Sequence, residues 1–163
     1  MEEKIQGTPA PSAEEKKKQG NSEIGMLTLI AIALVGRVLL EPFPSVEPII
    51  PIAVYAGLKY KKNTGTIVGL LSYPLANVFM LGGPFGLWSL LQATGGAIAG
   101  SIAEYGKELN TSDMVLYTAI GTLIFEFIMN VGNQAFLIWP FSITHIVTNV
   151  IIALVISGVA IKQ

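Results

Sequence analysis

A short group of ionisable residues interrupts the most apolar part of this chain. Residues 37–51 read RVLLEPFPSVEPIIP, with one cation, two carboxylates and four prolines between two stretches that are almost entirely hydrocarbon. Arg37 and Glu41 are four residues apart, a spacing that makes them neighbours on a helix. We interpret the segment as the outer turn between two membrane helices, which brings Arg37, Glu41 and Glu47 to the mouth of a binding cavity.

Further polar side chains recur within the later apolar runs, toward the same predicted end. Ionisable side chains at membrane depth are costly and usually face the interior of a helix bundle. A spacing of four residues puts both members of a pair on one helix face. The pairs are Trp88 with Gln92, Glu126 with Asn130, and His145 with Asn149, while Asn77 stands alone in an earlier run.

These residue types indicate how a cavity would hold a small molecule. Arg37 would bind an anionic or carbonyl group, and Trp88 would stack against a ring. Glu126 or His145 would pair with an amine or a ring nitrogen. The neutral hydrogen-bond partners would be Asn77, Gln92, Asn130 and Asn149.

Each of these residues also has a structural interpretation. Arg37 and Glu41 would then form an ion pair at the headgroups, and Glu47 would be solvated. His145 would be a core histidine bonded through one nitrogen, and Trp88 an interfacial aromatic residue. The side-chain amides of the Asn and Gln residues would form interhelical hydrogen bonds, worth about 0.6 kcal/mol each.

Composition places the chain in a membrane. Its 163 residues are 52% hydrophobic and 13% charged, and the mean hydropathy is +0.60. Soluble domains hold roughly 25% charged residues. Residues 1–23 alone hold nine of the 10 basic and 11 acidic residues, and we expect them to form a disordered cytoplasmic tail before a retained helix. The net charge of −1 gives no reason to expect nucleic-acid binding, and the chain has no cysteine.

Six apolar runs are long enough to be helices in a membrane, where about 20 residues span the hydrocarbon core and about 17 suffice. The sequence therefore predicts an all-α membrane domain over residues 24–163. The runs are Ile24–Leu40, Val46–Tyr60, Thr64–Leu81, Phe85–Ala103, Met114–Gly132 and Phe136–Ile161.

The lysines support six crossings. If all six runs cross, the nine lysines fall on one side: in the tail, the 59–63 loop, the 104–113 loop and the C-terminus. The positive-inside rule then puts both termini in the cytoplasm. With five crossings, the lysines of the 59–63 loop would lie outside.

The spacing of small residues and the absence of catalytic motifs limit the functions that fit this sequence. The GGAIAGSIA segment, residues 95–103, has small residues at four-residue spacing, which predicts either close packing inside the bundle or a surface for a partner. The chain has no G-x-x-x-x-G-K-[ST] loop, no H-E-x-x-H and only one histidine. We therefore expect no enzymatic activity of its own, no metal site and no cofactor.

Three segments together resemble the substrate-binding S components of energy-coupling factor (ECF) vitamin transporters. They are GRVLLEPFPSVEPIIPIAVYAG (36–57), NVFMLGGPFGLWSLLQATGGAIAG (77–100) and THIVTNVIIALVISG (144–158), and the likeness covers nearly all of residues 24–163. It implies a six-helix protein of a prokaryotic cell membrane with an outward-opening pocket for a water-soluble vitamin or related micronutrient.

The resemblance also implies partners: a transmembrane T component and two ATPase subunits. Many members dock the T component through an Ala-x-x-x-Ala pair on the first helix, where this chain has Ala31, Ala33 and Gly36. The ligand is not named by the sequence, since riboflavin-like, thiamine-like, cobalamin-related and queuosine-related compounds all fit. The alternative is a non-transporting membrane scaffold that packs through its small-residue helix faces, in which case the polar residues would not converge on one cavity.

Overall fold

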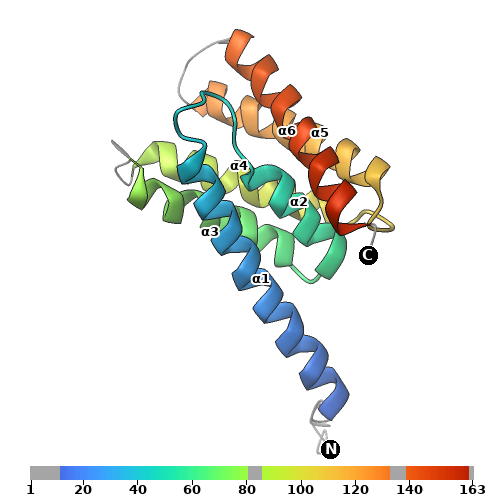
Figure 1. The fold of residues 1–163 in the computed structure, drawn as a ribbon. Coiled ribbons are helices and arrows are strands. Elements are labelled where there is room, and N and C mark those ends of the chain that lie inside the picture. The colour runs from blue at the N-terminus through green and yellow to red at the C-terminus, as the bar shows by residue number, and fades with distance from the viewer. Residues whose placement is uncertain (1–11, 81–85, 133–138, 162–163) are drawn as a thin grey trace, which may run out of the picture.

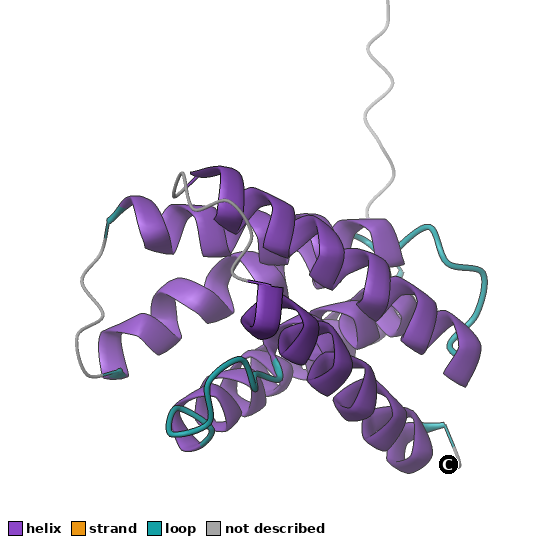
Figure 2. Cartoon of the chain, turned by 90° about the horizontal axis from the view of Figure 1, so that it is seen from above, coloured by secondary structure: helices purple, strands orange, loops and turns teal. Residues whose placement is uncertain are grey.

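The computed structural model describes residues 12–80, 86–132 and 139–161, and every regular element in these ranges is a helix. Figure 1 shows their arrangement, and Figure 2 shows from above that they cross one another at several angles. This confirms the all-α fold class. The helices are α1 (Ala13–Leu39), α2 (Ile49–Tyr60), α3 (Thr64–Phe79), α4 (Leu87–Ala103), α5 (Thr111–Gly132) and α6 (Trp139–Ala160).

Three of the described helices are long and apolar enough to cross a membrane. They contain the stretches Ser22–Leu39, Thr111–Gly132 and Phe141–Ala160. The helices α2 and α3 are apolar but shorter, with 12 and 16 residues. Large apolar side chains are exposed along α1, including Leu27 at 63% and Leu39 at 71%. Such a surface suits contact with lipid.

The helix α1 begins well before its predicted start at Ile24. It starts at Ala13, so residues 13–23, which we expected to be disordered, are helical. Alanine, glutamate, lysine and glutamine are strong helix formers, and no proline follows Pro11 in this part of the chain. With 27 residues, α1 is about 40 Å long, and its N-terminal part extends away from the other helices (Figure 1). Residues 1–11 of the predicted tail lie outside the described residues, as do the predicted helix starts at Phe85 and Phe136.

The centre of the bundle is α2, which packs against all five other described helices. Residues 49–58 are all buried, with Ile49, Ile50 and Val54 completely so. A helix that is apolar on every side is stable only when it is surrounded. This explains how the shortest of the six helices forms the core.

The glycines of α4 face α3 at very short range. A Cβ added at Gly69 would lie 2.1 Å from the carbonyl oxygen of Gly96, and one added at Gly100 would lie 2.0 Å from that of Gly65. On the α5 side, Gly95 lies against the ring of Phe125. The small-residue face of residues 95–103 therefore packs within the bundle.

The three residues predicted to dock a T component do not share one surface. Ala33 is completely buried, and a Cβ at Gly36 would lie 2.8 Å from the ring of Pro48. Only Ala31 is exposed. Docking at Ala33 and Gly36 stays a prediction: Ala33 is covered within this chain, and Pro48 of the connection after α1 lies against Gly36.

Two of the lysine-bearing connections meet at one end of the bundle. Lys61 donates from Nζ to the carbonyl oxygen of Gly106 at 2.5 Å. The backbone N–H of Asn63 donates to the carboxylate of Glu104 at 2.8 Å. The connection between α1 and α2, residues 40–48, lies at the other end of α2 (Figure 1).

Candidate ligand-binding site

Near the end of the bundle that carries residues 40–48 lies a cavity of about 300 Å³, partly open to the outside. Pockets that bind small molecules measure roughly 300–1,000 Å³, so this one is at the small end. Helices α1, α4, α5 and α6 and the 40–48 connection all contribute to its wall. The lining residues are Arg37, Ser45, Glu47, Trp88, Gln92, Phe125, Glu126, Met129, Asn130, Phe141, Ser142 and His145.

Seven of the ten residues predicted to bind a ligand line this cavity. The other three, Glu41, Asn77 and Asn149, do not. Residues of four different helices and of the 40–48 connection therefore line one hollow. The seven are Arg37, Glu47, Trp88, Gln92, Glu126, Asn130 and His145.

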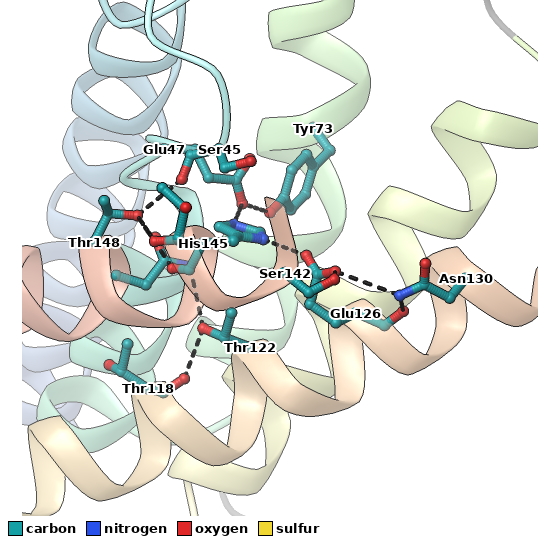
Figure 3. A network of polar contacts seen from close by, with 12 residues as sticks. Ser45, Glu47, Tyr73, Thr118, Thr122, Glu126, Asn130, Ser142, His145 and Thr148 are labelled. Atoms are coloured by element: carbon teal, nitrogen blue, oxygen red, sulfur yellow. Dashed lines mark hydrogen bonds and ion pairs between the residues drawn. The ribbon is translucent and has the colours of Figure 1, made fainter. Parts of the chain in front are cut away.

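Glu47 is the centre of a buried network at the back of the cavity. Its side chain is only 2% exposed. Arg37 donates from Nη1 to Oε2 of Glu47, and the hydroxyl of Tyr73 donates to Oε1. Nε2 of His145 lies 3.1 Å from the same Oε1, an ion-pair distance, although the ring N–H is not aligned for a hydrogen bond. Figure 3 shows Glu47, Tyr73 and His145 pointing toward one another.

The local backbone turns Glu47 inward. Ser45 has a φ of 62°, and its carbonyl oxygen accepts a hydrogen bond from the hydroxyl of Thr148 on α6 at 2.8 Å. Pro48 then immediately precedes α2. The connection is thus tied to α6 on one side of Glu47 and continues into the core on the other.

The charge state of Glu47 follows from its partners. Burial alone would raise the pKa of this carboxyl, but Arg37, His145 and the Tyr73 hydroxyl lower it from 4.5 to about 2. Glu47 lies in the connection between α1 and α2, outside the helices. It is therefore an anion at neutral pH, paired with two cationic side chains.

The predicted ion pair between Arg37 and Glu41 is wrong. The four-residue rule holds only while the helix continues, and α1 ends at Leu39. Glu41 lies in the following turn, where its backbone N–H donates to the carbonyl of Val38. No described residue forms an ion pair with it, and Arg37 pairs with Glu47 instead.

A second carboxylate, Glu126 on α5, faces the cavity from the opposite side of His145. Nδ1 of His145 lies 2.5 Å from Oε1 of Glu126. Ser142, one turn before His145 on α6, donates its hydroxyl to the other carboxylate oxygen. Asn130, one turn further along α5, donates to the backbone carbonyl of Glu126 at 2.8 Å. Figure 3 shows how these side chains connect α5 to α6.

Aromatic rings form the apolar part of the wall. Phe125 stacks on Tyr73 with a centroid distance of 5.1 Å and meets the ring of His145 edge-on at 5.4 Å. Trp88 lines the cavity and is 53% exposed, so its ring is free on one side. No sequence pattern distinguishes Phe125, Met129 or Phe141, since apolar residues in apolar helices resemble ordinary core residues.

Two of the predicted amides support the site from behind. Nδ2 of Asn77 donates to Oε1 of Gln92 at 2.8 Å and to the hydroxyl of Ser89 at 3.0 Å, which joins α3 to α4 and orients Gln92. Asn149 is completely buried and donates to the hydroxyl of Thr122 at 3.1 Å. Both follow the structural interpretation of interhelical hydrogen bonds.

Together the fold and the cavity define an all-helical protein with three described helices long and apolar enough to cross a membrane, and with a polar, aromatic-lined hollow at one end. Within the described residues, no group of three or more histidine, aspartate or glutamate side chains is arranged to hold a metal ion. Comparison with known proteins adds no relative: no protein-family model, no curated protein and no solved structure matches the chain.

Proposed function

We propose that this chain is the substrate-binding membrane subunit of an ECF-type importer, and that it captures a water-soluble vitamin or related micronutrient at the outer face. The observation that carries the proposal is the convergence of Arg37, Gln92, Glu126 and His145 on one cavity. A protein that used these residues only for packing would have no need of a shared hollow.

In this proposal the chain crosses a prokaryotic cell membrane six times, with both termini in the cytoplasm. The lysines of the 59–63 and 104–113 connections then all face inward. The short helices α2 and α3 are compatible with this count, because α2 is enclosed by the other described helices and need not match the thickness of the lipid.

The substrate would lie with a ring against Trp88 and its polar groups toward Gln92, Arg37 and Glu126. A mostly apolar pocket with a few polar groups that converge is typical of small-molecule sites. The cavity volume of about 300 Å³ favours a compact ring compound over a cobalamin-sized ligand.

Transport in this scheme needs partners. The chain has no phosphate-binding loop for ATP, so energy would come from two ATPase subunits through a transmembrane T component. Of the docking residues suggested by the resemblance, Ala31 is the one still exposed on α1.

The alternative of a non-transporting scaffold has less support. It depended on a free small-residue face, and the glycines of α4 lie against α3 and α5.

Ligand screening of the purified protein tests the proposal. A ligand at 100 times its Kd stabilises a protein by about 2.7 kcal/mol, so a vitamin panel should contain at least one compound that raises the melting temperature. Gln92→Ala should weaken that binding about tenfold or more, because Gln92 lines the cavity. Asn77→Ala should weaken it less, because Asn77 acts only through Gln92.

Glu41→Gln is the matched control, since Glu41 lies close to Arg37 in sequence but does not line the cavity. Equal affinity in wild type and Gln92→Ala would remove the site assignment. A panel without any stabilising compound would argue against the carrier function.

A further inference from the structure

The ionisable residues of the cavity wall are few, and they contact one another. Among the described lining residues, four ionise: Arg37, Glu47, Glu126 and His145. The remaining polar lining residues, Ser45, Gln92, Asn130 and Ser142, are neutral amides and hydroxyls.

The geometry determines the charge of the histidine. Nδ1 of His145 lies 2.5 Å from Glu126 and Nε2 lies 3.1 Å from Glu47. Two carboxylates at these distances place two negative charges beside the ring, and nearby negative charge stabilises the protonated form of an imidazole. With a carboxylate on each side, the ring is stable as the imidazolium.

The set is then electrically balanced. Arg37 and His145 supply two positive charges, and Glu47 and Glu126 supply two negative charges. Each cation contacts a carboxylate: Arg37 with Glu47, and His145 with both acids. Among the described lining residues, the cavity therefore has no charged group without an oppositely charged partner.

The two charges that remain within reach of a ligand have opposite signs. The side chains of Arg37 and Glu126 are each 18% exposed, whereas Glu47 is 2% and His145 is 7% exposed. Arg37 has five N–H donors, more than its ion pair with Glu47 uses. The wall thus presents a donor on one side and an acceptor on the other.

From this balance we propose that the ligand carries no net charge, and that it presents an acceptor to Arg37 and a donor to Glu126. The inference rests on the proposed function and names its class of substrate: a neutral or zwitterionic ring compound, in preference to a phosphorylated, carboxylate or cationic one. A net charge on the ligand would add an uncompensated charge to a balanced wall in a cavity that is only partly open to water, which is unfavourable.

The experiment measures the affinity of purified wild-type protein for compounds that differ in charge. Suitable pairs are nicotinamide with nicotinate, riboflavin with its 5′-phosphate, and pyridoxine with pyridoxal 5′-phosphate, with thiamine as a cationic probe. In any pair that binds, the neutral member should bind at least about tenfold more tightly, since burying an unpaired charge commonly costs more than that factor.

Tighter or equal binding of the charged member, or thiamine as the tightest ligand, would overturn the inference and leave the carrier function intact. If no compound binds, the site itself is in question, and both the function and the inference are overturned.

A variant provides the second measurement. Glu126→Gln leaves one excess positive charge, so the preference within a pair should move toward the anionic member by about tenfold or more. Glu41→Gln removes the same charge outside the cavity and should leave the preference unchanged. Size-exclusion chromatography identifies a misfolded variant, and the wild-type comparison does not depend on it. An equal loss of both members in folded Glu126→Gln contradicts the inference.

Discussion

At the scale of single residues, Glu47 shows the largest difference between the environment expected from the sequence and the one in the structure. In the sequence it stands between prolines in a turn, which is compatible with a solvated side chain. In the structure it is almost completely buried and receives Arg37 from α1, Tyr73 from α3 and His145 from α6. One carboxylate thereby joins three helices that are far apart in the chain.

This role predicts a specific acid sensitivity. Because the pKa of Glu47 is lowered from 4.5 to about 2 in the folded protein, its contribution to stability is fully present above pH 4.5 and is lost as the pH falls toward 2. The melting temperature in detergent should therefore fall between pH 5 and pH 3.

In Arg37→Gln the fall should be smaller, because a main cause of the lowered pKa of Glu47 is gone. Lys107→Gln removes an exposed positive charge far from the cavity and should show the same fall as wild type. An identical pH profile in Arg37→Gln and Lys107→Gln would contradict this account.

Some site residues could be predicted from the sequence and others could not. Polar side chains in apolar helices are conspicuous, which is why Trp88, Gln92, Glu126, Asn130 and His145 could be predicted. Tyr73 could not, because a tyrosine in an apolar helix is usually a core residue, and its partner Glu47 is 26 residues away. A pairing of this length depends on how the helices pack.

At the scale of elements, the contact between α3 and α4 depends on glycine. The backbones of the two helices touch at Gly69 with Gly96 and at Gly65 with Gly100. This close approach also brings Tyr73 on α3 and Gln92 on α4 to their places around the cavity. Small residues at these positions are therefore needed both for packing and for the geometry of the site.

Gly69→Ala should destabilise the protein by about 1–3 kcal/mol or more, because the new methyl group would overlap the carbonyl of Gly96. The measurement is the melting temperature in detergent. Gly158→Ala on α6 is the control: a Cβ there meets nothing within 4 Å, so stability should stay the same or rise slightly. Equal melting temperatures in wild type and Gly69→Ala would mean that α3 and α4 are not in backbone contact.

The predicted start of α1 is wrong, whereas its predicted end is nearly correct. The charge and polarity of residues 13–23 predict a disordered tail, yet Glu and Lys also favour helix. Continuation into an apolar helix removes the cost of starting a new one. The predicted end at Leu40, by contrast, is within one residue of the observed end at Leu39, because Pro42 and Pro44 follow closely.

At the scale of the whole molecule, the six-crossing topology is the prediction most open to direct test. The natural chain has no cysteine, so single cysteines can be introduced without further changes. Lys62→Cys and Lys107→Cys should react with a membrane-impermeant maleimide only from the cytoplasmic side. Phe43→Cys, at an exposed position of the 40–48 connection, should react only from outside.

Each variant serves as the control for the others, since all three positions are exposed to a reagent on the correct side. Labelling of Lys62→Cys and Phe43→Cys from the same side would exclude a crossing by α2.

The sequence predicted the fold class and most of the cavity wall for physical reasons. Lipid requires long apolar runs, and buried polar groups in such runs must meet one another. It could not predict which helix is central, because α2, α3 and α6 are all strongly apolar and only packing decides which is enclosed. Nor could it predict that Pro48 lies against Gly36, since this contact depends on the turn of the connection at Ser45.

The enclosure of α2 has a consequence for how the protein is made. Twelve residues reach only about 18 Å, well short of a hydrocarbon layer of roughly 30 Å. A newly synthesised α2 therefore cannot settle in lipid alone, and four of the helices that surround it are translated later. In the proposed topology, stable insertion of this segment would follow the synthesis of the later helices, so the future core would be without its neighbours for a time.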